Sequence, residues 1–553
     1  MSVEKLIVDH METWTSALQT RSTAGRGSSG KIDLYGIKKL RELILELAVR
    51  GKLVPQDPND EPASDLLKRI AAEKAELVKQ GKIKKQKPLP EISEEEKPFE
   101  LPEGWEWVHL PDIYCSISES SRKIKSSEIL PEGKYPVIEQ SQEFISGYCN
   151  NECLLIKLNN PVIVFGDHTR NIKFIDFDFV VGADGVKILS PILICERFFF
   201  WQLRSFKLDV RGYARHFKVL NSCLFALPPI AEQERIVEKV SSLMSLCDQL
   251  EQQSLTSLDA HQQLVETLLG TLTDSQNTAE LAENWARISE HFDTLFTTEA
   301  SVDALKQTIL QLAVMGKLVP QDPNDEPASE LLKRIAQEKA QLVKEGKIKK
   351  QKPLPPISDE EKPFELPEGW EWCRIGNIVN IKSELVSPKD YLNLYQVAPD
   401  IIEKGTGRVI SKRTVKESGV KGPNSRFYKG QIVYSKIRPS LSKVFLAEYN
   451  GLCSADMYPL DCHINPNYLL KYILSIPFLM QVKKAENRIK MPKLNSDSFY
   501  NIIVAIPPYN EQQAIFDKIN SIEAVCNGLI SYIGIYHKTQ LHLADALTDA
   551  AIN

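Results

Sequence analysis

The stretch "GKLVPQDPNDEPAS" occupies Gly51–Ser64 and occurs again, unchanged, at Gly316–Ser329. The similarity extends without a gap over residues 40–110 and 305–375, where 57 of the 71 aligned pairs are identical. Identity that high at so long a period indicates a duplicated module and not a solenoid of short repeats. The sequence therefore predicts two similar units, and the function must follow from what the duplication organises.

Two segments that share little identity lie between the repeated parts. Both open on "LPEGWEW", at Leu101 and Leu366, and the "PP…EQ" motifs that close them begin at Pro228 and Pro507. Each contains short apolar runs typical of strands, such as "NPVIVFG" and "KGQIVYSKI", and at least one helical stretch. This pattern predicts two α+β domains with mixed sheets, each entered by a strand that carries the two tryptophans of its opening motif.

Helices are predicted on either side of these domains. Apolar residues recur in steps of four and three along residues 236–250 and 515–533, which is the spacing of a coiled-coil seam. About 35 residues of helix at each place would span about 50 Å. A shorter helix is predicted after each "GKLVPQDPNDEPAS", with Ser64 and Ser329 as its N-cap residues.

Together these features predict an α+β chain in which long paired antiparallel helices separate and brace two mixed α/β domains, with an internal pseudo-twofold repeat. The expected parts are a helical frame region at 1–100, a first variable domain at 101–226, a central frame region at 227–364, a second variable domain at 365–505 and a C-terminal frame helix at 506–553. Such a frame would hold two unlike domains at a fixed separation.

The composition of the 553 residues, 42% hydrophobic and 25% charged, is that of a globular protein. No apolar run reaches the length of about 18 residues that a membrane span requires, and no signal peptide is visible. The ten cysteines show neither metal-site nor redox spacing. We therefore expect a protein of the reducing cytoplasm, without a metal site.

The charge is unevenly distributed along the chain. The whole chain carries −5, yet residues 376–505 hold 19 Lys and Arg against 10 Asp and Glu, a net +9. Residues 111–226 hold 14 against 13, a net +1. A basic domain in an acidic frame indicates an anionic partner, clearly for the second variable domain and weakly for the first.

The arrangement of "LPEGWEW", "LPP…EQ" and a following long helix, present twice, resembles the specificity subunits of type I restriction–modification systems. The preamble "LAVRGKLVPQDPNDEPAS" resembles one branch of that family, type IB. The resemblance implies a subunit without catalysis or cofactor of its own, whose two domains each read one half of an asymmetric, two-part DNA target. It also implies two methyltransferase subunits and two motor-nuclease subunits as partners, which would supply the sites for S-adenosylmethionine, ATP and Mg²⁺.

In the first variable domain, DNA contacts are predicted at two polar segments, because bases are read by donors on loops and phosphates are held by Lys, Arg and backbone N–H groups. The first segment, "FGDHTRNIKF", follows a buried strand and can also be an ordinary hairpin tip. The second, "RGYARHFKVLN", precedes the last strand. The candidates are His168, Thr169, Arg170, Asn171, Arg211, Tyr213, Arg215, His216 and Lys218.

In the second variable domain, "VKGPNSRFYKGQIVYSKIRPSLSKV" interleaves basic residues with aromatic and hydroxyl side chains. "NRIKMPKLN" occupies the place of "RGYARHFKVLN" in the first domain. A solvated basic face is the alternative interpretation. The candidates are Lys421, Asn424, Arg426, Tyr434, Lys436, Arg438, Ser440, Lys443, Arg488, Lys490 and Lys493.

Two other classes of protein fit parts of the sequence. The "IPPY" at Ile506–Tyr509 resembles the base-binding motif of amino-methyltransferases, but Ile506 stands where a polar residue must accept a hydrogen bond, and no glycine-rich cofactor loop follows an early strand. A coiled-coil scaffold or a DNA-binding regulator without restriction–modification partners is the remaining alternative.

Overall fold

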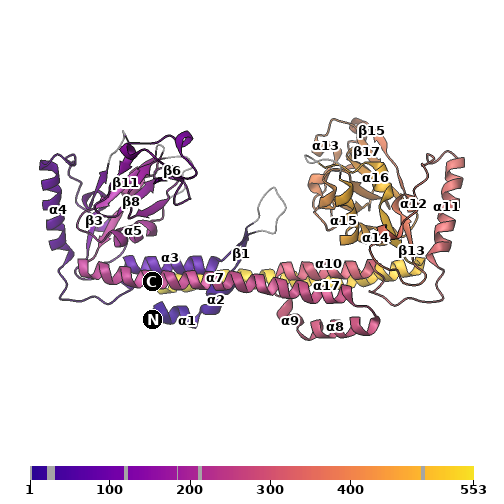
Figure 1. The fold of residues 1–553 in the computed structure, drawn as a ribbon, viewed down its shortest axis with the longest axis horizontal. Helices are drawn as coiled ribbons and strands as arrows, with labels where there is room; N and C mark the ends of the chain where they lie inside the picture. The colour runs from indigo at the N-terminus through magenta and orange to yellow at the C-terminus, as the bar shows by residue number, and fades with distance from the viewer. Residues whose placement is uncertain are drawn as a thin grey trace. The chain divides into compact units, whose positions relative to one another are not determined.

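The computed structural model describes residues 3–21, 31–117, 122–182, 185–208, 215–486 and 492–552. The chain forms two compact units, one made of Met1–Ser257 with Tyr536–Asn553 and the other of Leu258–Ile535. Each unit contains one copy of the repeat and one domain built on β-sheets (Figure 1). The prediction of a duplicated α+β chain with two sheet-bearing domains is therefore confirmed.

Two long helices contribute to both units. Helix α7 (Ile230–Asp274) has 45 residues and α17 (Tyr509–Ile552) has 44, longer than the roughly 35 predicted. The residues of the predicted seam are buried or half-buried, as a coiled-coil spacing requires. They are Ile236, Val240, Leu243, Cys247, Leu250, Ile515, Ile519, Ile522, Cys526, Leu529 and Ile533.

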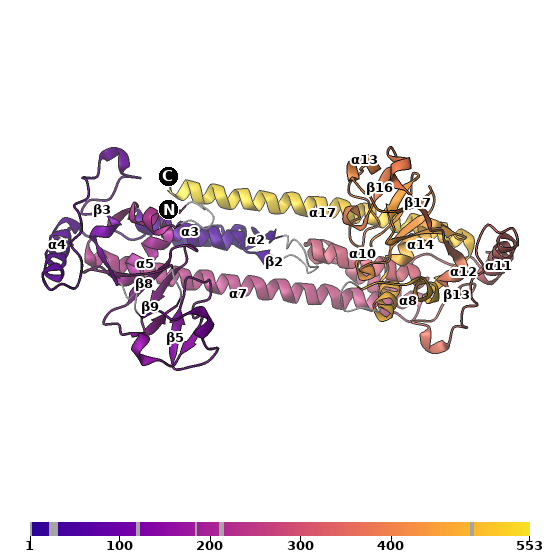
Figure 2. The same cartoon turned by 90° about the horizontal axis from the view of Figure 1, so that it is seen from above.

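The frame of the first unit is helical. Figure 2 shows α3 between α7 and α17, where Arg41 pairs with Asp248 of α7 at 2.6 Å and Tyr35 donates to Asp545 of α17 at 2.7 Å. A two-stranded sheet precedes α3. The remaining elements of this frame are α1 (Val3–Asp9), α2 (Met11–Ser16), β1 (Gln19–Arg21), β2 (Lys31–Asp33), α3 (Tyr35–Val49) and α4 (Ala63–Lys79).

In the second unit, α10 takes the place of α3. Its apolar side chains share one core with segments of α7 and α17, in which Val265, Ile309 and Cys526 are at most 2% exposed. No described helix of either unit combines the length and the apolar character that crossing a membrane requires. The remaining helices of this frame are α8 (Thr278–Glu290), α9 (Phe292–Leu295), α10 (Glu299–Val314) and α11 (Ala328–Lys344).

Helices α4 and α11 correct one prediction. They begin at Ala63 and Ala328, so Ser64 and Ser329 lie inside the first turn and are not N-caps. A tertiary contact takes the place of the cap, since the Ala63 N–H donates to the Gly104 carbonyl at 2.8 Å, with the same contact in the second copy. The helix starts where the incoming domain strand supplies an acceptor.

The first sheet domain has two four-stranded sheets and a two-stranded one. The strand orders are β4-β11-β8-β9, β6-β5-β10-β7 and β12-β3. The bounds are β3 (Glu106–His109), β4 (Tyr114–Ile117), β5 (Tyr135–Ile138), β6 (Gly147–Cys149), β7 (Leu155–Ile156), β8 (Val162–Gly166), β9 (Ile172–Ile175), β10 (Phe179–Val181), β11 (Val186–Pro191), α5 (Glu196–Ser205), α6 (Phe217–Asn221) and β12 (Leu224–Leu227).

The second sheet domain has the orders β14-β21-β18-β19, β15-β17-β20-β16 and β13-β22. The bounds are β13 (Glu371–Arg374), α12 (Ile375–Ile378), β14 (Val379–Ile381), β15 (Glu384–Val386), β16 (Tyr395–Val397), α13 (Val415–Ser418), β17 (Asn424–Phe427), β18 (Ile432–Ser435), β19 (Val444–Leu446), β20 (Gly451–Ser454), β21 (Met457–Cys462), α14 (Pro466–Ile473), α15 (Ile476–Ala485), α16 (Ser496–Asn501) and β22 (Ile503–Ile506).

The two domains share one topology although their sequences do not align. In both, the first sheet contains a hairpin, β8–β9 or β18–β19, beside a central strand, β11 or β21. In both, β10 or β20 pairs in parallel with one neighbour and antiparallel with the other. They differ at one edge strand, which is β6 beyond β5 in the first domain and β15 beyond β17 in the second. The hairpins are therefore equivalent positions in two different domains.

Candidate nucleic-acid interface

Each sheet domain is joined to its frame by the same buried contact. The Trp105 indole N–H donates to Glu232 at 2.9 Å, and Trp370 donates to Glu511 at the same distance. The two tryptophans come from "LPEGWEW" and the two glutamates from "PP…EQ". All four are at most 5% exposed, and burial raises the pKa of both glutamates. The motifs that open and close each domain thus meet in one hydrogen bond.

The glutamine of each "EQ" pair binds a helix of the sheet domain. Gln233 accepts from the Cys195 N–H at the start of α5 at 2.9 Å, and Gln512 accepts from the Asn465 N–H at the start of α14 at 2.9 Å. Each glutamine also donates to a proline carbonyl of its own motif at 3.0 Å. Because both glutamines are fully buried, these bonds fix the orientation of each sheet domain on its long helix.

The phrase "GKLVPQDPNDEPAS" packs against the same junction. Gly51 has φ of +66°, and a Cβ there would lie 2.4 Å from Pro102 Cγ; Gly316 has φ of +70° and meets Pro367 at the same distance. A few residues on, Gln56 donates to Glu232 at 3.1 Å. The identity of the two phrases follows from these two identical junctions, which leave no room for a side chain at the glycine.

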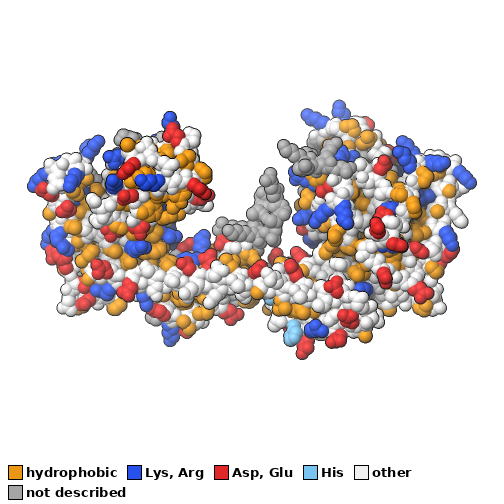
Figure 3. Space-filling view, viewed as in Figure 1, with side chains coloured by type: hydrophobic (Ala, Val, Ile, Leu, Met, Phe, Trp, Pro, Cys, Tyr) orange, Lys and Arg blue, Asp and Glu red, His pale blue; other side chains and the backbone are white. Residues whose placement is uncertain are grey.

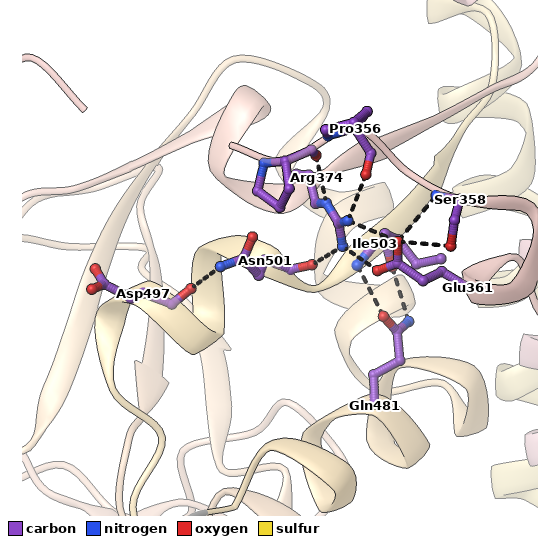
Figure 4. A network of polar contacts seen from close by, with 9 residues as sticks. Pro356, Ser358, Glu361, Arg374, Gln481, Asp497, Asn501 and Ile503 are labelled. Atoms are coloured by element: carbon purple, nitrogen blue, oxygen red, sulfur yellow. Dashed lines mark hydrogen bonds and ion pairs between the residues drawn. The ribbon is translucent and has the colours of Figure 1, made fainter. Parts of the chain in front are cut away.

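One position of the junction differs between the copies. Arg374, 6% exposed, donates to the carbonyls of Pro355, Pro356 and Asn501 and pairs with Glu361 at 2.7 Å (Figure 4). The equivalent residue in the first copy, 265 positions earlier in the alignment, is His109, whose Nε2 makes a single contact with the Pro90 carbonyl at 2.8 Å. The second sheet domain is therefore held by more bonds at this point.

The β8–β9 hairpin tip carries four of the predicted candidates. It is held by Gln140, whose carbonyl accepts from the side chains of Thr169 and Asn171, and whose side-chain oxygen accepts from the His168 N–H at 3.2 Å. Arg170 has φ of +62°, a conformation that costs energy for a residue with a Cβ, and its guanidinium donates to the Leu208 carbonyl at 2.8 Å. Arg170 as a whole is half-buried.

The second predicted segment of this domain gives a mixed result. Arg215 and Lys218 are exposed, whereas His216 is 1% exposed and its Nδ1 contacts the Asp167 carbonyl at 3.1 Å. His216 is therefore a packing residue that does not form part of the surface. Arg211 and Tyr213 lie outside the described residues.

The β18–β19 hairpin tip is longer. Arg438 is exposed and has φ of +46°, and its N–H donates to the Pro492 carbonyl at 2.8 Å. The N–H and hydroxyl of Ser440 both donate to the Glu486 carboxylate. Lys443 donates to the Pro399 carbonyl. The tip thus presents Arg438 outward while the neighbouring polar groups are used to hold the loop.

Two lysines of the second domain share one carboxylate. Lys493 lies 3.2 Å and Lys436 lies 3.9 Å from Asp456, and burial together with the charge of Lys493 lowers the pKa of Lys436. An isolated antiparallel β-bridge between Ile437 and Lys493 joins the β18–β19 loop to the segment that precedes α16. The structure thus places Lys493 beside the hairpin tip. Arg488 and Lys490 lie outside the described residues.

Three further candidates are poorly placed for contact with a ligand, and one is exposed. Tyr434 is 1% exposed and packs on Phe499, and Asn424 is 3% exposed. Arg426 lies on β17 between the rings of two tyrosines and 3.8 Å from Glu384. Tyr434 and Asn424 therefore belong to the interior, whereas Lys421 is exposed.

The hairpin anchors Gln140 and Glu486 were missed by the sequence analysis, because each lies about 30 or more residues from the nearest tip residue that it binds. The described residues contain no group of three or more metal-ligating side chains. On the face drawn in Figure 3, basic and acidic side chains are interspersed over both sheet domains. The candidate interface is therefore defined by the two hairpin tips and not by overall charge.

Comparison with known proteins gives consistent matches. A family model described as "Type I restriction modification DNA specificity domain" matches residues 102–260 and again residues 367–533. The specificity subunit of the type I restriction enzyme EcoAI from Escherichia coli is 51% identical over the full length of both chains, and that of EcoEI, also from Escherichia coli, is 49% identical over the full length of both. A solved structure from work on complex assembly and conformational transition of the type I R-M system is 15% identical, covers 82% of this chain and 99% of that one, and has a TM-score of 0.44.

Proposed function

The chain belongs to the family of type I restriction–modification DNA specificity subunits, and from this premise we propose that each of its sheet domains reads one half of an asymmetric, two-part DNA target. The chain is a non-catalytic subunit, so its part in the reaction is to position a partner on a chosen sequence. Its assignment to the type IB branch stays a prediction.

The observation that carries the proposal is the equivalence of the two hairpins. The β8–β9 and β18–β19 tips occupy the same place in the shared topology, differ in sequence and length, and each hold an arginine in a left-handed conformation. A backbone conformation that costs energy persists where surrounding contacts fix it, often at sites of function. Two unlike loops at one position are what the reading of two unlike half-sites requires.

The chemistry of the tips favours contact with the major groove. An arginine that forms two parallel hydrogen bonds to O6 and N7 distinguishes guanine from the other bases. Arg438 is exposed and Arg170 is half-buried. We assign these two residues to base reading, and we assign Arg215, Lys218 and Lys421 to phosphate contacts.

The duplicated frame supports the recruitment of two equivalent partners. The junction contacts of Trp105 with Glu232 and of Trp370 with Glu511 are the same in both copies. Two equal frames would offer two equal docking surfaces, hence two methyltransferase subunits and, for cleavage, two motor-nuclease subunits. In this proposal S-adenosylmethionine, ATP and Mg²⁺ bind to those partners, and the complex acts in the cytoplasm.

The long helices support a fixed spacing between the half-sites. Helices α7 and α17 are each uninterrupted, and each contributes to both units. We propose that the two half-sites lie about one helical turn of DNA apart, about 34–36 Å between their centres, as paired readers on one face of a duplex require.

A selection experiment tests the proposal. The full chain with its methyltransferase partner is used to select from a randomised duplex, and the bound DNA is sequenced. We expect an asymmetric motif of two short parts with a constant gap. Enrichment of one continuous motif, or of none, would contradict the proposal.

A further inference from the structure

The first sheet domain contains a hollow of about 620 Å³ beside its hairpin tip. One side is formed by residues 169–173 of the β8–β9 hairpin, and the other by residues 203–208, the end of α5 and the segment after it. Gln142 and Phe144 complete the wall. The hollow is thus built by segments that are adjacent only in the folded domain.

The charged side chains that line this hollow are all basic. They are Arg170, Lys173, Arg204 and Lys207, and no acidic side chain is among the described lining residues. Lys173 is occupied, because its ammonium donates to the carbonyls of Glu139 and Glu143. Three cations therefore face the same space. A cavity lined by one sign of charge concentrates the field and attracts an ion of the opposite sign.

Arg204 and Lys207 make no ion pair or hydrogen bond with any residue in the described parts of the chain, and both are exposed. The Arg204 guanidinium lies 5.5 Å from the ring of Trp201 and 5.7 Å from that of Phe200, which hold it by cation–π contact. Burial lowers the pKa of Arg204, and the charge of Arg41 on the frame, which is already paired with Asp248, lowers it further. The guanidinium is oriented but not neutralised.

The equivalent place in the second sheet domain is different. A smaller hollow of about 350 Å³ lies beside the β18–β19 tip and is lined by residues near the end of α14, but frame residues of α10 and α17 also line it. Two of its lining cations have acidic neighbours, since Lys306 lies 3.5 Å from Asp303 and Arg408 lies 2.7 Å from Glu403. Asp303 and Glu523 are also among its lining residues, so of these two hollows only the one in the first domain has a charged lining that is basic throughout.

We propose that this hollow binds a phosphate of the DNA backbone through Arg204 and Lys207, next to the bases read by Arg170 and the rest of the β8–β9 tip. The inference rests on the proposed function and names two residues, Arg204 and Lys207, that no sequence motif singled out. It also accounts for DNA binding by a domain whose net charge is only +1, because its positive charge is concentrated where the backbone passes. Phosphate contacts fix the register of a protein on the duplex, and base contacts supply the sequence preference.

The test uses the full chain with its methyltransferase partner and a duplex that carries the selected target. Lys207→Gln and Arg204→Gln are each expected to weaken binding about tenfold at physiological salt and to make the log–log dependence of affinity on salt shallower by about one. The selected motif is expected to stay unchanged. Lys157→Gln, at an exposed lysine of the same domain outside the hollow, is the control and should change neither quantity.

Two further measurements keep the outcomes distinct. Arg204→Lys retains the charge, so the dependence of affinity on salt should stay as steep as in the unmodified chain. If Arg204→Gln instead acted only by disturbing the packing on Trp201, it would weaken binding without making that dependence shallower. Inorganic phosphate at millimolar concentration should protect Lys207 from amine-reactive labelling less than the target duplex does, which distinguishes a DNA backbone site from a site for free phosphate. An unchanged salt slope in both Gln variants, with the two-part motif still selected, would overturn this inference and leave the proposed function intact. Loss of the two-part motif in the unmodified chain would instead remove the proposed function.

Discussion

The two sheet domains share most of their topology and the buried Trp–Glu contact that attaches them to the frame, yet they differ at the hairpin tips, where a ligand would be met. Trp105 with Glu232 and Trp370 with Glu511 form junctions with equal distances. The hairpin tips, in contrast, differ in length, in their anchors and in the charge of the neighbouring hollow. Buried junctions tolerate few solutions because every polar group needs its partner, whereas a surface loop on a rigid sheet is free to change. The duplication thus separates what must stay constant from what can vary.

The strongest way to break this comparison is to remove a junction tryptophan. Trp105→Ala and Trp370→Ala should each lower the free energy of unfolding of their own unit by about 3–5 kcal/mol, because a buried aromatic ring is lost and one oxygen of a buried carboxylate loses its donor. Chemical denaturation of the full chain, with hydrogen exchange to assign each loss to its unit, measures both. Trp107→Ala, at a half-buried ring, is the control with a smaller expected cost. Clearly unequal costs for the two junctions would mean that they are not equivalent.

Substitutions of Arg374 and His109 test a position at which the two junctions differ. Arg374→Ala should destabilise the second unit by about 2–3 kcal/mol, because it leaves the carbonyls of Pro355, Pro356 and Asn501 without their donor. His109→Ala should cost the first unit less than about 1 kcal/mol, since a single hydrogen bond is lost. The same denaturation experiment applies, and similar costs for both variants would refute the assigned role of Arg374.

Substitution of the two hairpin arginines tests whether each sheet domain reads its own half-site. Arg170→Ala should relax sequence preference in one half-site only, and Arg438→Ala in the other, each with about tenfold to a hundredfold weaker binding to the full target. Selection from a randomised duplex with each variant reports which half is affected. If either substitution altered both halves, or neither, the assignment of one reader to each domain would fail.

The smallest expected effect is a change in how stability depends on pH, caused by the half-buried lysines Lys74 and Lys339. Both donate to a backbone carbonyl at 2.7 Å, and burial lowers the pKa of both, that of Lys339 to about 8. Between pH 8 and the ordinary lysine pKa near 10.5, the unfolded chain binds more protons, so this lysine makes the second unit more stable as pH rises. Lys339→Met should remove that rise, by about 1 kcal/mol after allowance for solvent screening. Thermal unfolding at pH 8 and pH 10 measures it, with Lys74→Met as the partner in the first unit, and a rise that survives in the Lys339 variant would contradict the assigned cause.

Much of the fold could be predicted from the sequence, because apolar spacing records which faces are buried. The buried positions along α7 and α17 and the β8–β9 hairpin follow directly from it. The prediction that Ser64 and Ser329 are N-caps was wrong, because a tertiary acceptor, the carbonyl of Gly104 or Gly369, takes the place of a local cap.

The candidate site was harder to predict from the sequence. The polar segments were found, but the orientation of each side chain depends on neighbours distant in sequence. His216, Tyr434 and Asn424 turn inward for that reason. Arg204 joins Arg170 only through the packing of α5 beside β9, so no motif could have signalled the hollow.

The central claim is that equal frames present interchangeable readers, and a domain exchange tests it most directly. The second sheet domain, residues 365–505, is replaced by a copy of the first, residues 101–226, and methylated adenines are mapped in DNA from cells that carry this chain and its methyltransferase partner. We expect the target to become an inverted repeat of the first half-site with nearly the original gap. A target that stays asymmetric, or half-sites unrelated to the original first half, would contradict the account.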